Sequence, residues 1–403
     1  MTATSTTSAH SLSGLRVLDL SRVLAGPFCG AMLGDMGADV LKIEDTRGGD
    51  EARTWPPQLK GESAMYVANN RNKRGICIDL KAPEGVEIIL DLVRKSDVVI
   101  ENFRTGTMES FGLGYETLAR ENPGIIYSSV SAFGRTGPRA ESAGYEALIQ
   151  AFSGIMSITG ETDGPPTRAG VSALDIMTGT MCAFGILNAI LYRQQTGLGQ
   201  RVDGSLLDTS LSLLNFHIQN YLFSGVASKR VGAAHTSIVP YRNYRCKDAE
   251  WIFIAGANER LWERLAKALK LDWMLQDPRF ATNTDRVNNR RAVDVEVEAM
   301  VAQYDREELL GLLDEAGVPV SPVNSVDQAL RDPQTASRTV LKRMSHPMLG
   351  EIDSLGLPLE FSRLTSAIRR HAPRLGEHTD EVLAELGYSV ERIAGLRAGK
   401  VVA

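Results

Sequence analysis

One carboxylate stands alone in a long apolar stretch of this chain. Asp175 is the only charged residue between Gly170 and Tyr192. The residues that follow it are helix-forming, so a helix is expected to begin at or beside Asp175, where backbone N–H groups and the helix dipole keep a carboxylate ionised. Such a carboxylate, partly desolvated, can attack an activated acyl group. The pattern is therefore compatible with both a helix N-cap and a nucleophile.

A cluster of cations is the second candidate for chemistry. The run Asn69–Gly75 holds Arg71, Lys73 and Arg74, and we expect it to form a turn before a strand. It is either a solvated loop or, beside a sheet crevice, a site for phosphate groups, which Arg and Lys bind through charge-assisted hydrogen bonds. Arg47 and Arg104, near predicted strand ends, are further candidates for this site.

Several classes of site and partner are excluded. The sequence has no GxSxG elbow, no phosphate-binding P-loop and no GxGxxG after its first strand. The six histidines show no paired metal spacing, and an isolated histidine such as His235 is typically structural. The four cysteines lie far apart, which favours buried free thiols in a reducing cytoplasm over zinc or disulfides. A net charge of -5 argues against a general nucleic-acid binder.

The predicted elements place these residues in an α/β fold. A strand over 15–20, a helix from Pro27 to Gly37 and a strand over 39–44 form a βαβ unit, which implies a parallel sheet with a ligand crevice at its carboxyl ends. Strands over 76–79, 98–103 and 125–130 continue it. Residues 226–330 read as a smaller α+β domain, and residues 1–13 as a flexible tail without signal-peptide character. The apolar run 176–191 is too short for a comfortable membrane span, so it predicts a buried helix and no membrane partner.

Eight stretches, in this order, resemble one family. They are Arg22–Pro27, Gly37–Glu44, Asn72–Arg74, Val99–Phe103, Gly144–Glu146, Asp163–Pro166, Thr196–Gln200 and Leu375–Asp380. Their order and spacing are similar to those of the family III CoA-transferases, the group of the formyl-CoA, carnitine and bile-acid enzymes. The resemblance covers the chain from about residue 13 to its end.

The resemblance implies both an architecture and a reaction. It implies a Rossmann-like large domain built from residues 14–195 and 331–403, a linker over 196–225, the small domain over 226–330, and ring-shaped subunits interlocked in a homodimer. It also implies that CoA passes from an acyl-CoA to a free carboxylic acid through anhydride and aspartyl-CoA thioester intermediates on Asp175. A thioester is already activated, so neither ATP, metal nor a further cofactor is expected.

The resemblance also assigns residues. It places Tyr145 and Glu146 beside the acyl pocket as catalytic partners of Asp175. The residues expected at the CoA site are Val23, Leu24, Ile78, Asn102 and Phe103. The family's basic residues are replaced here by Asp45, Ser110 and Ala143, so the phosphates would fall to Arg47, Arg74 or Arg104.

The substrate branch is indicated by one loop. The Gly-rich loop of the formyl-CoA enzyme is absent, and residues 234–241 look like the branch that acts on dicarboxylates, including succinyl-CoA:hydroxymethylglutarate and mesaconyl-CoA transferases. We expect His235, Thr236, Ser237 and Tyr241 to hold the distal carboxylate of a C4–C6 dicarboxylate, since a buried carboxylate needs donors or a cation. The same side chains would otherwise satisfy only their own loop.

Two other functions are weighed against transfer. A related racemase needs a His-Asp pair near Gly144–Glu146, but no histidine occurs between His10 and His217. A non-catalytic acyl-CoA-binding protein would not need Asp175 and Glu146, and a single-turnover assay separates it from an enzyme.

Overall fold

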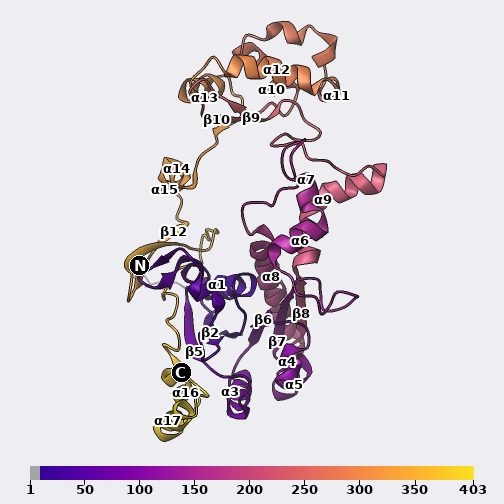
Figure 1. Cartoon of the computed structure of the whole chain (residues 1–403). Coiled ribbons are helices and arrows are strands. Elements are labelled where there is room, and N and C mark those ends of the chain that lie inside the picture. Colours follow the sequence, from indigo (N-terminus) through magenta and orange to yellow (C-terminus); the bar gives the residue numbers. More distant parts are fainter. Residues whose placement is uncertain (1–9) are drawn as a thin grey trace, which may run out of the picture. The chain divides into compact units, whose positions relative to one another are not determined.

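The computed structural model describes residues 10–403, and these form two compact units (Figure 1). The first holds the described chain up to Ser153 together with Ala169–Gln219 and Thr339–Ala403. The second holds Gly154–Arg168 and Asn220–Arg338. Most of the expected tail over 1–13 lies outside the described residues. Leu12, however, is buried and donates its N–H to Met36 O at 3.1 Å, so the packed chain begins before residue 14.

A six-stranded sheet, parallel throughout, is the frame of the first unit. Its spatial order is β5-β2-β1-β6-β7-β8. The strands are β1 (Arg16–Asp19), β2 (Asp39–Glu44), β5 (Lys73–Cys77), β6 (Val98–Glu101), β7 (Ile126–Ser131) and β8 (Arg201–Ser205). The order reverses direction between β1 and β6, which makes this point the expected ligand crevice of a doubly wound sheet. The predicted parallel α/β fold is confirmed.

The central strands of the sheet are rich in Val, Ile and Leu, so both faces of the sheet must be covered. Helices provide this cover, and the strands are buried. The first-unit helices are α1 (Ala25–Asp35), α2 (Ala64–Asn70), α3 (Pro83–Val93), α4 (Thr107–Ser110), α5 (Tyr115–Glu121), α6 (Glu146–Ser153) and α8 (Ala173–Thr196), with η1 (Glu51–Thr54) and the short pair β3 (Gln58–Leu59) and β4 (Glu62–Ser63) between them. α9 (Leu206–Ser224) begins in this unit.

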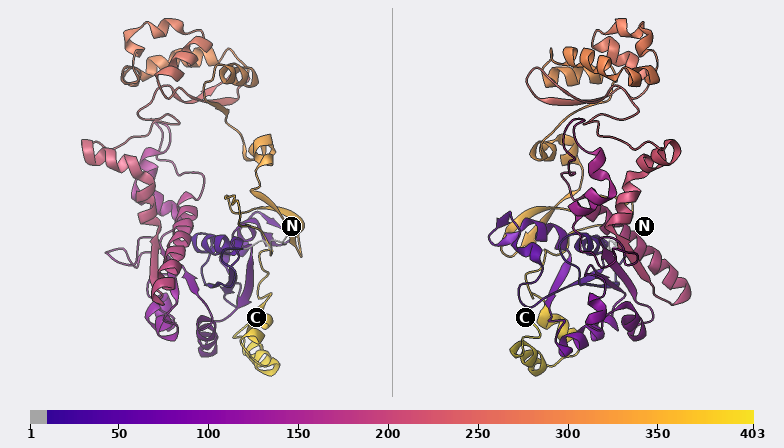
Figure 2. Two further views of the ribbon diagram at one scale, coloured as in Figure 1. Left: turned by 180° about the vertical axis from the view of Figure 1, so that it is seen from behind. Right: turned by 45° about the vertical axis from the view of Figure 1, so that its right-hand side comes forward.

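Helix α8 corresponds to the predicted apolar helix and packs beside α1, β7 and β8 (Figure 2). It is long and apolar enough to cross a membrane by length and composition alone, but it lies against the core of this unit. One face differs from the prediction of a buried helix. Met181, Phe184, Leu191 and Tyr192 are exposed in the single chain.

The cation run differs from the prediction of a turn. Strand β5 begins at Lys73, three residues before the expected start, so Lys73 and Arg74 lie inside the sheet. Lys73 is fully buried and pairs with Asp19 at 2.7 Å, while Arg71 pairs with Asp35 at 2.6 Å. A buried charge needs such a partner. The run therefore stabilises the packing of β5 against its neighbours and is neither a solvated loop nor a phosphate site.

The end of the chain returns to the first unit. Strands β12 (Leu341–His346) and β13 (Gly350–Leu355) form a hairpin, and α16 (Thr379–Glu385) and α17 (Val390–Ala398) follow. α16 lies beside β5, where His378 N donates to Gly75 O at 2.8 Å (Figure 1). Residues 300 positions apart in sequence thus share one edge of the sheet.

The second unit has its own core. An antiparallel sheet in the order β11-β10-β9 packs with α10, α12 and α13. Asn258 caps α10 by accepting a bond from Leu261 N at 3.0 Å. The elements are α7 (Ile155–Ile158), β9 (Tyr241–Arg245), β10 (Trp251–Ala255), α10 (Glu259–Ala268), η2 (Asp272–Leu275), η3 (Pro278–Phe280), α11 (Asn283–Asn288), α12 (Arg290–Val301), α13 (Arg306–Glu315), β11 (Val320–Pro322), α14 (Val326–Arg331) and α15 (Pro333–Ser337). Whereas we expected one segment over 226–330, residues 154–168 also belong to this unit.

Candidate active site

A cavity of about 420 Å³ opens at the switch point of the sheet. The loops that follow β1 and β6 form one side of it, and the starts of α6 and α8 form the other. Of the residues expected in the site, Val23, Leu24, Asn102, Phe103, Arg104, Tyr145, Glu146 and Asp175 all line this cavity. Segments separated by more than 150 residues in sequence therefore meet where the topology predicts a ligand.

Close packing of two helices places Asp175 here. Gly179, one turn into α8, lies so close to α1 that a Cβ atom at this position would stand 2.4 Å from Ala25 O. Only glycine permits this approach. It brings the first turn of α8, which carries Asp175, to the first turn of α1. The cap position of α8 is Ser172 and not Asp175, so the N-cap interpretation of Asp175 is wrong.

The surroundings of Asp175 favour its neutral form. Burial, and to a smaller extent the charge of Glu146, together raise the pKa of Asp175 from 3.8 to about 7. A carboxyl group with a pKa near neutrality, in a cavity, is typical of a reactive position. Its ionised form is less solvated than a surface carboxylate, and this favours attack on an electrophile.

Glu146 is the second buried carboxylate, and one of its oxygens is free. It is only 7% exposed at the start of α6, and its Oε1 accepts a bond from Gln150 Nε2 at 2.5 Å. Its Oε2 is buried without a hydrogen-bond partner among residues 10–403. A buried oxygen without a partner is costly, so a ligand or a shared proton is expected at this atom.

The loop after β1 is held from both sides. Val23 has a φ of 67°, which is rare for a β-branched residue, and its N–H donates to both carboxylate oxygens of Asp50 at 3.1 Å. Asp50 in turn pairs with the fully buried Lys42 at 3.1 Å. On the other side, Asn102 bonds the backbone N–H and C=O of Arg22, each at 2.8 Å. The cavity wall is thus rigidly supported.

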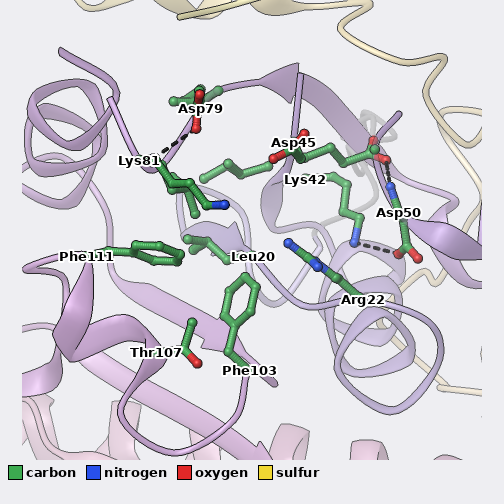
Figure 3. A pocket seen from close by; sticks show the side chains of 15 residues that line it. Leu20, Arg22, Lys42, Asp45, Asp50, Asp79, Lys81, Phe103, Thr107 and Phe111 are labelled. Atoms are coloured by element: carbon green, nitrogen blue, oxygen red, sulfur yellow. Dashed lines mark hydrogen bonds and ion pairs between the residues drawn. The ribbon is translucent and has the colours of Figure 1, made fainter. Parts of the chain in front are cut away.

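A second pocket of about 310 Å³ adjoins this cavity, and Arg22 and Phe103 line both (Figure 3). Ile78, expected at the CoA site, lines the second pocket and not the first. Two cations there were not found from the sequence. Arg22 lies over the Phe103 ring with its Cζ 4.8 Å from the centroid, and Lys81 follows β5. The signal that could have found Lys81 is a lysine between a strand end and the helix-initiating Pro83.

The three arginines assigned to the CoA phosphates differ in how well they fit that role. Arg74 is 4% exposed and bonds Asp39, Glu381 and Glu385 at distances of 2.6 to 3.2 Å, so its guanidinium has no capacity left for a phosphate. This assignment is wrong. Arg47 is exposed and pairs with Asp45 at 3.3 Å, outside the lining of both pockets. Arg104 lines the larger cavity.

Three of the residues expected to hold the distal carboxylate, His235, Thr236 and Ser237, lie in the loop of the second unit before β9, and the fourth, Tyr241, is the first residue of β9. His235 N donates to Tyr241 O at 3.0 Å, and Ser237 N donates to His235 Nδ1 at 3.1 Å. Thr236 Oγ1 lies 3.4 Å from Ser237 Oγ. The structure thus groups the four residues, and the contacts within the loop engage part of their hydrogen-bonding capacity.

Comparison with known proteins gives a consistent result. The model of CoA-transferase family III matches residues 12–379. A succinate–glutarate CoA-transferase of Agrobacterium fabrum is 40% identical, over 95% of this chain and 97% of its own length. The human succinyl-CoA:glutarate CoA-transferase is 37% identical, over 97% of this chain and 90% of its own. The crystal structure of a CaiB/BaiF family protein from Brucella suis, 40% identical, superposes with a TM-score of 0.85 over 93% of this chain and 99% of that one.

Proposed function

Because this chain belongs to CoA-transferase family III, we propose that it moves CoA from succinyl-CoA to a C4–C6 dicarboxylate through covalent intermediates on Asp175. The observation that carries the assignment to Asp175 is its position. It lies partly buried beside Glu146, in the cavity at the switch point of the sheet.

The reaction begins when an Asp175 oxygen attacks the thioester carbonyl. The C–S bond breaks, CoA leaves as a thiolate, and succinate and Asp175 share a mixed anhydride. The thiolate then attacks the Asp175 carbonyl, which releases succinate and leaves an aspartyl-CoA thioester. The acceptor carboxylate attacks that thioester, its C–S bond breaks to release CoA thiolate again, and a second anhydride forms between the acceptor and Asp175. The CoA thiolate then attacks the anhydride carbonyl that came from the acceptor acid, which gives the new acyl-CoA and regenerates the Asp175 carboxylate.

The chain's own groups support these steps. The first turn of α1 contains no acidic residue and its cap residue, Leu24, makes no side-chain cap bond, so the positive end of this helix remains available where Leu24 and Ala25 line the cavity. This end favours the negative charge of each tetrahedral intermediate. Phe103, Arg22 and Arg104 offer an apolar face and cations for the nucleotide end of CoA. No step needs ATP or a metal, since each attacked group is already an activated acyl.

Succinyl-CoA is proposed as the donor because the relatives named above are a succinate–glutarate CoA-transferase and a succinyl-CoA:glutarate CoA-transferase. The loop of His235, Thr236, Ser237 and Tyr241 supplies hydroxyl and imidazole groups suited to a distal carboxylate. This part of the proposal rests on those side chains and on the relatives' substrates.

A homodimer, with subunits interlocked as the resemblance implies, is also proposed. The apolar face of α8 exposes Met181, Phe184, Leu191 and Tyr192, and an exposed apolar face of this kind typically marks a protein contact. We propose a second copy as its partner. The four buried free thiols suit a reducing cytoplasm, where we expect the enzyme to act.

The proposed mechanism is tested by trapping the intermediate. The chain is mixed with succinyl-CoA without acceptor, and mass spectrometry of the intact chain and of its peptides locates the adduct. We expect CoA on the peptide that contains Asp175, and none on Asp175→Asn, which should retain the fold but transfer no CoA. Turnover of Asp175→Ala near the wild-type rate would refute the assignment.

A further inference from the structure

Gln150 lies on the same helix as Glu146 and also bonds the backbone four residues before α8, the helix that carries Asp175. It is only 1% exposed, in the second turn of α6. Its Nε2 donates to Glu146 Oε1 at 2.5 Å, and its Oε1 accepts from Ala169 N at 2.9 Å. Ala169 precedes α8, whose first turn carries Asp175. One side chain therefore joins the carboxylate of Glu146 to the backbone that leads to Asp175.

The orientation of this amide is fixed by its partners. A backbone N–H can only donate, so the oxygen of the Gln150 amide must face Ala169. The NH₂ group must then face Glu146. It occupies Oε1 and leaves Oε2 as the carboxylate atom without a partner. The path of the chain makes this link specific, because the chain leaves the first unit after Ser153 and re-enters it at Ala169. The hydrogen bond from Ala169 N to Gln150 Oε1 therefore joins the segment where the chain leaves the first unit to the residue where it returns.

We infer that Gln150 is a positioning residue for CoA transfer: it fixes the Glu146 carboxylate beside Asp175 and, as a neutral amide, supplies a donor there without adding charge. The inference rests on the proposed function. It also gives a role to a buried polar side chain that does not itself line the cavity but bonds Glu146, which does. The other titratable groups of the surroundings are Arg22, Glu51, Arg104 and Tyr145 in the cavity lining, and Cys182, Tyr192 and Arg193 on α8, which packs against α6.

A double-mutant cycle tests whether Gln150 acts through Glu146. Gln150→Met keeps the length of the side chain but removes both hydrogen bonds, and we expect kcat to fall about tenfold or more while KM for succinyl-CoA changes by less than about twofold. If Gln150 acts by positioning Glu146, adding Gln150→Met to Glu146→Gln should cause little further loss. Losses that multiply, or a Gln150→Met variant with a lower melting temperature and a normal kcat, would overturn the inference.

The charge part of the inference has a separate test. Gln150→Glu can still accept from Ala169 N–H but places a third carboxylate against Glu146. We expect the acid limb of the rate profile to move to higher pH by about one unit or more, since added negative charge favours protonated Asp175. The matched control is Asn122→Asp, an amide that accepts from Gly124 N and donates to Val93 O and Ser96 O away from the cavity. It should leave the profile unchanged. An unmoved limb in Gln150→Glu would contradict the inference.

Failure of the proposed function is distinguishable from failure of this inference. Carbon-13 carboxyl titration, assigned with Asp175→Asn, measures the protonation of Asp175 without any turnover. If the wild type transfers no CoA from any donor, the proposed function fails. The Asp175 midpoint must nevertheless rise in Gln150→Glu and stay constant in Asn122→Asp. If it does not rise, Gln150 has no influence on the pair, whatever reaction the protein performs.

Discussion

Replacing Asp175 by asparagine should stabilise the free protein at alkaline pH while it removes transfer. Burial and the charge of Glu146 raise the pKa of Asp175 from 3.8 to about 7. Each pKa unit corresponds to about 1.4 kcal/mol, so keeping this group ionised costs the folded state about 4 kcal/mol above pH 7. The charge lies in the first turn of α8, where the helix dipole returns about 0.3–1 kcal/mol. Burial dominates, and the net gain for Asp175→Asn at pH 8 is about 3 kcal/mol.

The sign of this effect depends on pH in a defined way. Between about pH 4 and pH 7 the folded protein binds a proton at Asp175 that the unfolded chain has lost, so the free energy of unfolding of the wild type falls as pH rises through this window. Below about pH 4 the Asp175 carboxyl is protonated in both the folded and the unfolded state, so the extra stability of Asp175→Asn disappears. The transfer rate should change in the opposite direction, rising with pH through about 7 as Asp175 ionises.

Urea unfolding followed by circular dichroism, at about pH 5 and pH 8 without ligand, measures the difference. We expect Asp175→Asn to exceed the wild type by about 3 kcal/mol at the higher pH and by only about 1.5 kcal/mol at the lower, since the unfolded carboxyl has already lost most of its proton at pH 5. Glu116→Gln, which removes an exposed carboxylate on α5, serves as the control and should change little at either pH. An Asp175→Asn variant that is no more stable than the wild type at pH 8, or equally stabilised at both pH values, would refute the reasoning.

Three further predictions concern the reaction and its scaffold. Transfer should proceed at an unchanged rate in EDTA and without ATP, and activity that returns only with a divalent ion would contradict the mechanism. Succinyl-CoA should be preferred over butyryl-CoA by about 100-fold in kcat/KM, since leaving a carboxylate-binding pocket unpaired typically costs several kcal/mol; equal rates would mean that no such pocket exists. Gly179→Ala should lose about 1–3 kcal/mol of stability and most of its activity, because the new Cβ meets Ala25 O at 2.4 Å and forces α1 from α8. A melting temperature and kcat like those of the wild type would show that the contact is unimportant.

Local pattern was sufficient for much of the fold. The strand over 39–44 was predicted with its observed bounds, since Val40, Leu41 and Ile43 follow the turn residue Gly37. Asp175 could be singled out because one charge in a stretch of 23 apolar or neutral residues is conspicuous in any structure.

The partners of these residues could be decided only by the tertiary structure. The cations of residues 71–74 look like a phosphate site in sequence, yet their carboxylate partners come from Asp19, Asp35, Asp39 and the distant α16. Likewise, nothing local predicts that Gln150 meets Ala169, or that Gly179 lets α1 approach α8. The sequence by itself determined the family and most of the elements, and it singled out Asp175 as the proposed nucleophile, since these depend on short-range propensity and on motif order. Contacts between segments far apart in the chain decide which charges are paired, whether Glu146 Oε2 has a partner among residues 10–403, and what surrounds Asp175. The desolvation that raises the pKa of Asp175 exists only after those segments have packed.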